Sequence, residues 1–129
     1  MTKLLLIALG GAVGSIGRYL LGGWVQRLAP GGGTFPIGTL AVNALGCLLI
    51  GILAAAFAGP HLVRDETRLL LMVGILGGFT TFSTFGLETF ELINEGDFAR
   101  AALNIALSLI VCLAAVWIGY RVAERIFGA

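Results

Sequence analysis

The sequence predicts an all-helical integral membrane protein with four transmembrane helices, the third of which is interrupted. Hydrophobic residues make up 58% of the 129-residue chain, charged residues make up 12%, and the mean hydropathy is +1.01. A chain this apolar cannot cover its own surface in water, because soluble domains are about 25% charged. A spanning helix needs about 20 residues, so four of them use most of the chain as a single transmembrane domain.

The four predicted helices cover approximately residues 4–28, 37–58, 67–94 and 98–127. Polar or helix-breaking segments separate them. Residues 29–36 are rich in Pro and Gly, Gly59-Pro60-His61 leads into charged residues, and Glu95-Gly96-Asp97 forms a polar turn. We take His61 as a solvated loop histidine.

An even number of spans predicts that both termini lie on one side of the membrane. The cationic residues expected to flank the spans on that side are Lys3, Arg64, Arg68, Arg121 and Arg125, and those expected on the other side are Arg27 and Arg100. The positive-inside rule then favours cytoplasmic termini. The bias is modest and is compatible with insertion in either orientation. A net charge of +1 indicates no nucleic-acid partner, and Cys47 and Cys112 are predicted to be packing residues.

The predicted interruption covers Gly77-Gly78-Phe79-Thr80-Thr81. Adjacent glycines and β-branched threonines disfavour a helix. A break at membrane depth frees carbonyl and amide groups that protein, water or an ion must satisfy, and freed carbonyls facing each other would make a sodium-sized cage. The alternative is a kinked helix whose threonines donate back to carbonyls four residues earlier.

Several polar residues within the spans are candidates for function, because such groups are costly in hydrocarbon. Arg18 either extends toward an interface, or it lines a wet vestibule or pairs with a carbonyl. Thr39 and Asn43 lie four residues apart on one helix face. The Asn43 amide can donate to an anion or form an interhelical hydrogen bond.

Two further polar features lie in the second half of the chain. Asn104, Ser108 and Cys112 form a stripe on the fourth helix, which suits either a narrow water path or a packing face. Glu88 is the one acid well inside the third span, and it suits a proton relay, a binding site or a hydrogen-bonded structural group.

Three segments together resemble one protein family. The sequence from Gly77 to Phe85 (GGFTTFSTF), followed by Glu88, resembles the signature of the Fluc (CrcB) family of fluoride channels. Residues 10–19 (GGAVGSIGRY) and 36–46 (PIGTLAVNALG) are similar to that family's first-helix and second-helix motifs. Length and four-helix layout also agree, so the resemblance covers essentially the whole chain.

This resemblance implies an antiparallel, dual-topology homodimer in the lipid of the bacterial cytoplasmic (inner) membrane. Two interface pores would allow passive fluoride export, which lowers cytoplasmic fluoride and its toxicity. A structural sodium ion, not itself transported, would be held by the carbonyls of Gly77 and Thr80 from each subunit. No other cofactor is implied.

The resemblance also implies roles for side chains. Phe82 and Phe85, three residues apart on one helix face, would present ring edges to fluoride, because aromatic edges are electropositive. Asn43 would donate to fluoride in the pore. The weaker pore-lining candidates are Thr39, Ser83, Thr84 and Ser108, and the vestibule or structural candidates are Arg18 and Glu88. Cys47 and Cys112 depart from the family pattern, and Cys112 puts the outer end of a polar track in doubt.

The main alternative is a small four-helix multidrug or cation antiporter. Such proteins resemble one another in a functional glutamate within the first helix, whereas this first helix has no acid and carries Arg18. A non-transporting membrane subunit would have no need of the interrupted helix. No nucleophile–base pair and no metal-ligand cluster is apparent in the sequence, so it does not predict an enzyme.

Overall fold

The computed structural model describes residues 1–29, 34–58 and 63–127, and every regular element in these ranges is a helix. The elements are α1 (Thr2–Leu28), α2 (Ile37–Ala56), α3 (Asp65–Arg68), η1 (Leu69–Leu76), α4 (Gly77–Phe79), α5 (Phe82–Asn94) and α6 (Phe98–Phe127). Four stretches of the described residues are long and apolar enough to cross a membrane: Thr2–Leu28, Ile37–Ala56, Asp65–Asn94 and Phe98–Phe127. The prediction of an all-helical protein with four spans is confirmed.

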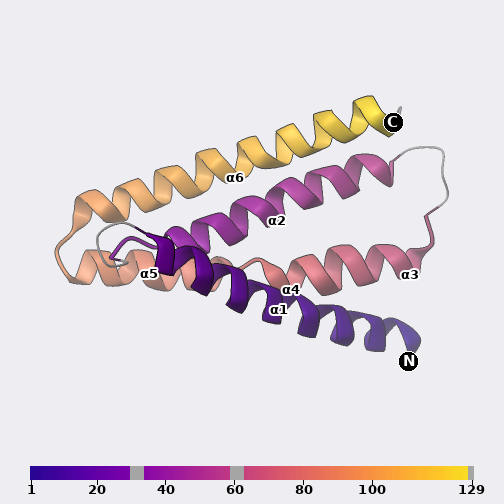
Figure 1. Ribbon diagram of the computed structural model, residues 1–129, viewed down its shortest axis with the longest axis horizontal. Helices are drawn as coiled ribbons and strands as arrows, with labels where there is room; N and C mark the ends of the chain where they lie inside the picture. Colours follow the sequence, from indigo (N-terminus) through magenta and orange to yellow (C-terminus); the bar gives the residue numbers. More distant parts are fainter. Residues whose placement is uncertain (30–33, 59–62, 128–129) are drawn as a thin grey trace.

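The spans run alternately up and down, so both ends of the chain lie at the same end of the bundle (Figure 1). The elements from α3 to α5 follow one another along the third span, and α6 returns beside α2. The middle of the first predicted loop, residues 30–33, lies outside the described residues, as do residues 59–62 with His61.

The distribution of side chains is the reverse of that in a soluble protein. Large apolar side chains point outward, as with Leu9 at 65% and Leu113 at 68% exposure. The buried interior is made largely of small residues, such as Ala55 and Ala123. Helices in lipid associate through small residues that let their backbones approach, because lipid is as apolar as leucine.

The most extensive helix pairing joins α2 to α6. A Cβ atom at Gly51 would collide with the backbone of Val116, and one at Gly119 would collide with the backbone of Leu48. The two helices therefore touch backbone to backbone. This contact fixes which face of α6 is turned toward the rest of the bundle.

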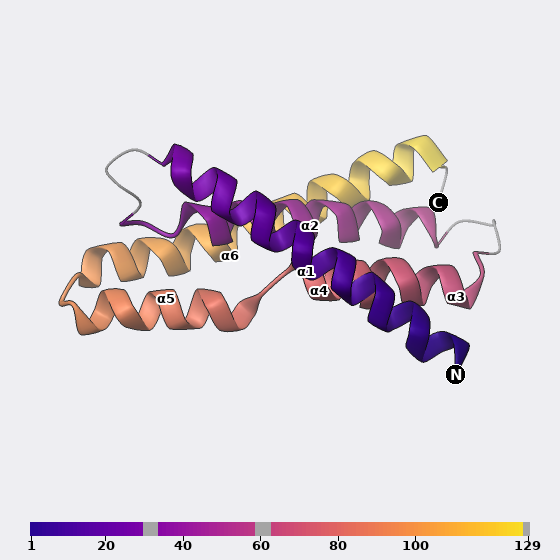
Figure 2. The same cartoon turned by 60° about the horizontal axis from the view of Figure 1, so that its bottom comes forward.

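The third span is interrupted, as the sequence predicts, at a shorter segment. Residues Leu69–Leu76 form a π-helix, which the sequence did not predict, and Gly77–Phe79 continue as α-helix. Only Thr80 (φ −83°, ψ 159°) and Thr81 (φ −151°, ψ 119°) are extended before α5 begins. Figure 2 shows this link between α4 and α5, with α1 crossing the third span diagonally.

The two glycines of the predicted interruption are thus helical. Gly78 serves a packing role, because a Cβ atom there would lie 3.0 Å from the Cα of Gly11 on α1. The break itself falls on the β-branched pair Thr80 and Thr81, whose restricted side chains favour extended backbone.

Candidate functional site

The break in the third span is held open by a side chain from α2. The Asn43 amide nitrogen donates to the carbonyl oxygen of Thr81 at 2.9 Å, and the amide N–H of Thr81 donates to the Asn43 Oδ1 at 2.8 Å. A carboxamide presents one donor and one acceptor side by side, as a peptide does. Asn43 therefore replaces the helix hydrogen bonds that Thr81 has lost, which matters because unpaired backbone groups are costly in lipid.

Threonine hydroxyls close the two helix ends at the break. Thr81 is the N-cap of α5, and its hydroxyl oxygen accepts from the Thr84 amide at 3.2 Å and donates to the Thr84 hydroxyl at 2.9 Å. The Ser83 hydroxyl lies 3.3 Å away from that of Thr81. On the other side, the Thr80 hydroxyl donates to the Leu76 carbonyl at 3.0 Å. The result is a cluster of hydroxyl groups at the break.

Helix α2 also packs directly against the break. A Cβ atom at Gly46 would collide with the Thr80 side chain and would lie 3.4 Å from the Phe79 ring. Gly46 and Asn43 are three residues apart, so they share the helix face that meets the third span. Glycine at this position lets α2 come close enough for the Asn43 amide to reach Thr81.

The carbonyls predicted to hold sodium flank this break. Within the described residues, no hydrogen bond outside the regular helices ends on the carbonyl oxygen of Gly77 or Thr80. The described residues also contain no group of three or more His, Cys, Asp or Glu placed to hold a metal ion. Backbone oxygens suit a hard cation, so Gly77 and Thr80 fit the ligand type that sodium requires.

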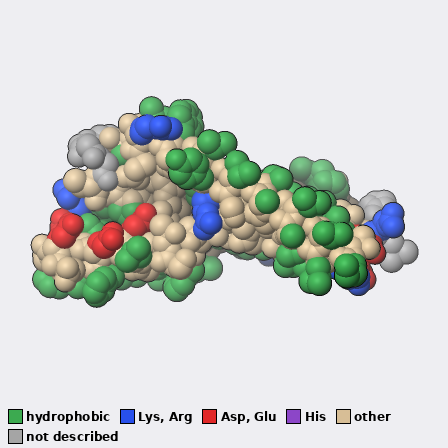
Figure 3. All heavy atoms as spheres, turned by 90° about the horizontal axis from the view of Figure 1, so that it is seen from below, with side chains coloured by type: hydrophobic (Ala, Val, Ile, Leu, Met, Phe, Trp, Pro, Cys, Tyr) green, Lys and Arg blue, Asp and Glu red, His purple; other side chains and the backbone are tan. Residues whose placement is uncertain are grey.

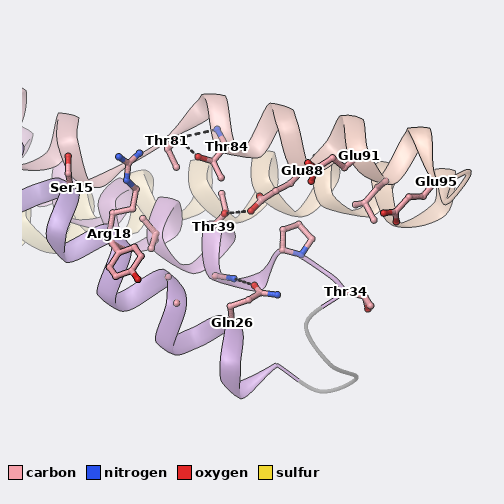
Figure 4. Close-up of a pocket in the computed structure, with 17 residues that line it drawn as sticks. Ser15, Arg18, Gln26, Thr34, Thr39, Thr81, Thr84, Glu88, Glu91 and Glu95 are labelled. Carbon is pink, nitrogen blue, oxygen red and sulfur yellow. Dashed lines mark hydrogen bonds between the residues drawn. The ribbon is translucent and has the colours of Figure 1, made fainter.

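A cavity of ≈ 620 Å³ opens between α1, α2 and α5 and reaches inward to Thr81. Figure 4 shows Arg18 and Thr39 facing α5 across it, with Glu88, Glu91 and Glu95 following one another along α5. In Figure 3, acidic side chains gather along one edge of this hollow. Water therefore has a route from one end of the bundle to the break, past three carboxylates and one guanidinium.

Glu88 is tied to α2 within this cavity. The Thr39 hydroxyl donates to its Oε1 atom at 2.6 Å. Its Oε2 atom is buried and, among the described residues, has no hydrogen-bond partner. One oxygen thus holds α5 to α2, while the other is a buried acceptor open to a proton or a donor entering the cavity.

Phe82 and Phe85 form a ring pair on α5, with centroids 5.3 Å apart and planes tilted by 46°. Phe82 is 81% exposed and Phe85 is half-buried. Neither is among the described residues that line the cavity. The pair lies on the outer surface of the single chain, immediately after the break.

Comparison with known proteins identifies the family. Residues 5–120 match the family model described as CrcB-like protein, Camphor Resistance (CrcB). This chain belongs to the CrcB family. The predicted resemblance is confirmed.

Full-length relatives agree with this assignment. A Geobacter sulfurreducens protein named fluoride-specific ion channel FluC is 49% identical over 126 residues, which cover 98% of this chain and 100% of that protein. Proteins of the same name from Opitutus terrae and Agrobacterium fabrum are 49% and 46% identical, over 95% and 98% of this chain and 93% and 100% of theirs. Names of channels rather than enzymes support the prediction that this CrcB-family chain is not an enzyme.

The CrcB-family structure divides the predicted site residues into three groups. Those that line the cavity are Arg18, Thr39, Thr84 and Glu88. Those at the break are Asn43, Ser83, Gly77 and Thr80, and those on outer or interhelical surfaces are Phe82, Phe85 and Ser108. Asn43 forms an interhelical hydrogen bond with Thr81, and Arg18 lines the cavity. Whether either residue meets an anion stays a prediction.

Along the fourth-helix stripe, the residues differ in their surroundings. Asn104 is 2% exposed and donates to the Thr89 hydroxyl at 2.9 Å. Ser108 and Cys112 are half-buried, and Cys112 and Cys47 are free thiols.

Two residues that shape the candidate site are absent from the predicted site residues. Thr81 falls within the predicted interruption, and a threonine at the start of a helix is a recognisable N-cap signal. Gln26 donates to the Phe35 carbonyl at 2.9 Å and accepts from the Gly38 amide at 2.8 Å, so it holds the α1–α2 connection at the cavity mouth. No local sequence pattern indicates the Gln26 contacts.

Proposed function

We propose that this chain is a fluoride-selective ion channel of the bacterial cytoplasmic (inner) membrane, through which fluoride leaves the cell passively. Full-length relatives at 45–49% identity that are named fluoride-specific ion channels support this function. The structural observation that supports it best is the cavity that reaches from one end of the bundle to the hydroxyl cluster at Thr81. Passive export would lower cytoplasmic fluoride and its toxicity.

The chemistry of the route suits a small, tightly hydrated anion. A pore must replace the anion's water with donors that bind weakly enough for release. Arg18, Thr39 and Thr84 supply donors around the cavity. Beyond the break, Ser83, Ser108 and the ring edges of Phe82 and Phe85 continue the proposed path, with the second N–H of Asn43.

A second copy of the chain is required to enclose this path. Phe82 is 81% exposed and Ser83 is also exposed, immediately beside the freed backbone of the break. Hydroxyl and backbone groups are costly to present to lipid. An inverted second copy packed on this face would cover them, and it gives the antiparallel homodimer that we propose.

A sodium ion is proposed at the centre of that dimer as a structural ion that is not transported. The Gly77 and Thr80 carbonyls of the two copies would hold it. Bound there, it would supply a fixed positive charge between the two anion paths without placing a cation in either one.

The proposed function is tested by fluoride efflux from liposomes that contain only the purified protein. We expect fluoride efflux that depends on the protein, with chloride efflux slower by orders of magnitude. Equal leakage of both anions, or no fluoride efflux from a correctly assembled protein, would overturn the proposal.

The ring-edge role has its own test in the same liposomes. Phe82→Ile and Phe85→Ile should each abolish fluoride efflux while the dimer persists. Phe90→Ile is the matched control, because Phe90 is on the same helix, is 61% exposed and lies outside the proposed path. Wild-type efflux in both ring variants would remove the ring-edge role.

The alternative of a cation antiporter is favoured by one observation, the three carboxylates Glu88, Glu91 and Glu95 on the cavity wall. Proton-coupled exchange of a cation predicts that an imposed pH gradient drives uptake of a cationic substrate. A fluoride channel predicts electrogenic fluoride efflux with no such coupling, so the two functions give opposite results in one liposome preparation.

A further inference from the structure

A buried chain of hydrogen bonds links α6 to the beginning of α5. The Asn104 amide donates to the Thr89 hydroxyl oxygen at 2.9 Å, and the Thr89 hydroxyl donates to the Phe85 carbonyl at 2.7 Å. Asn104 is 2% exposed and Thr89 is 7% exposed, and no other described asparagine is as buried as Asn104. Figure 1 shows α5 and the beginning of α6 side by side, at the end of the bundle opposite the two termini.

The direction of each hydrogen bond in this chain is determined by chemistry. An amide nitrogen can only donate, so the Thr89 oxygen must accept from Asn104. The Phe85 carbonyl oxygen can only accept, so the single hydrogen of the Thr89 hydroxyl goes to it. Each group therefore has one role, and loss of Asn104 removes the group that orients the Thr89 hydroxyl.

The chain ends on Phe85, one of the two residues whose rings belong to the proposed path. Phe85 lies in the first turn of α5, just after Thr81 caps that helix. A side chain's direction on a helix follows from the position of its own backbone turn. A second hydrogen bond on the Phe85 carbonyl, from a side chain anchored to α6, fixes that turn relative to the packed α2–α6 pair.

We propose that Asn104 is a positioning residue for the Phe85 ring, acting through the Thr89 hydroxyl. It does not contact the ring, and it orients the turn from which the ring extends. The importance of that orientation for permeation rests on the proposed function, whereas the orientation itself does not. Asn104, the first residue of the polar stripe on α6, therefore acts on α5 of the same chain.

The orientation is tested by ¹⁹F NMR on the assembled protein with 4-fluorophenylalanine incorporated at position 85 alone. We expect Asn104→Ala to shift and broaden the resonance, Thr89→Val to do the same, and Thr89→Ser to leave it as in the parent. The same label at Phe90 should not respond, since Phe90 is outside the chain of bonds. Asn94→Ala is the matched control variant, because Asn94 is an exposed asparagine at the end of α5.

A double-mutant comparison distinguishes a relay from two independent contacts. If Asn104 acts only through Thr89, the Asn104→Ala/Thr89→Val protein should give the same position-85 resonance as Thr89→Val alone. Additive changes would overturn the inference, as would an unchanged resonance in both single variants. Should Asn104→Ala fail to assemble, Thr89→Val, which keeps the shape of the side chain, carries the test by itself.

Fluoride efflux from liposomes then tests whether the orientation of the Phe85 ring matters for permeation. We expect Asn104→Ala and Thr89→Val to slow efflux by about tenfold, the equivalent of about 1.4 kcal/mol, with the dimer intact and Thr89→Ser restoring the rate. A changed resonance with unchanged efflux would support the positioning role and would overturn the permeation role of the Phe85 ring. Slowed efflux with an unchanged resonance would overturn the positioning role.

Discussion

Asn43 and Thr81 are paired through both backbone groups of Thr81, at 2.8 and 2.9 Å, although they lie 38 residues apart in the chain. The pair joins α2 to the point where the third span loses its helix. The same helix face carries Gly46 against Thr80. The break is therefore a supported feature, and its support comes from a neighbouring helix.

Removal of the Asn43 amide should destabilise the protein at the break. Asn43→Ala leaves both Thr81 groups without their partner, and leaving buried polar groups unpaired costs about 1–3 kcal/mol each. Asn43→Asp keeps the acceptor and removes the donor, so we expect an intermediate loss. Thermal unfolding in detergent measures both, with Asn94→Ala as the control. If Asn43→Ala is as stable as the parent, the hydrogen bonds between Asn43 and Thr81 do not stabilise the folded protein.

The Thr81 cap should be separable from the Thr81 backbone contacts. Thr81→Val keeps the branched shape and removes the hydroxyl that accepts from Thr84, which should cost about 1 kcal/mol of helix stability. Hydrogen exchange at the amides of the first turn of α5 is the measurement. Thr81→Ser should retain the protection. Protection that is kept in Thr81→Val and lost in Thr81→Ser would point to side-chain shape rather than capping.

Because α2 lies so close to the break, we expect a substitution at Gly46 to reduce both stability and fluoride efflux. Gly46→Ala would push the new Cβ atom into the Thr80 side chain and move the break away from Asn43. Overpacking of this kind costs about 1–3 kcal/mol, and we expect efflux to fall at least about tenfold, the equivalent of about 1.4 kcal/mol. Gly11→Ala is the control, because nothing lies within 4 Å of a Cβ atom there. Comparable effects at both positions would argue against this contact.

The acidic mouth of the cavity should slow the entry of an anion. Glu91 and Glu95 are exposed and line the cavity. Replacing both with Gln should raise fluoride efflux by about two- to tenfold at low ionic strength, where charges act over about 30 Å, and much less at 1 M salt, where they act over about 3 Å. Efflux assays at two concentrations of an impermeant salt measure this. A rise that does not depend on salt would contradict an electrostatic cause.

If the proposed sodium ion is bound, fluoride efflux and dimer formation should both depend on which cation is present. Exchange of sodium for a large organic cation at constant ionic strength should reduce both efflux and the population of dimer, because carbonyl groups from the two copies would face each other uncompensated. Cross-linking and efflux measured on the same samples test this. Full activity after exhaustive removal of sodium would reject the ion.

The sequence alone predicts the four spans, the common side of the termini and an interruption within residues 77–81. These are local properties: hydropathy depends on which residues follow one another, and β-branched residues disfavour a helix wherever they occur. The sequence also indicates that Thr39, Asn43 and Glu88 are polar groups that need partners in the membrane.

Only the tertiary structure decided which partners those groups have. Glu88 accepts from Thr39, 49 residues away, and Asn104 donates to Thr89 from the next helix. Both glycines of the predicted break proved to be helical, and Gly78 packs against Gly11 of α1, a contact that no local pattern reveals. Partner choice depends on the rotation and height of each helix in the bundle. Backbone contacts such as that of Gly51 with Val116 set both, which is why the sequence predicts a break within residues 77–81 but not the side chain that holds it.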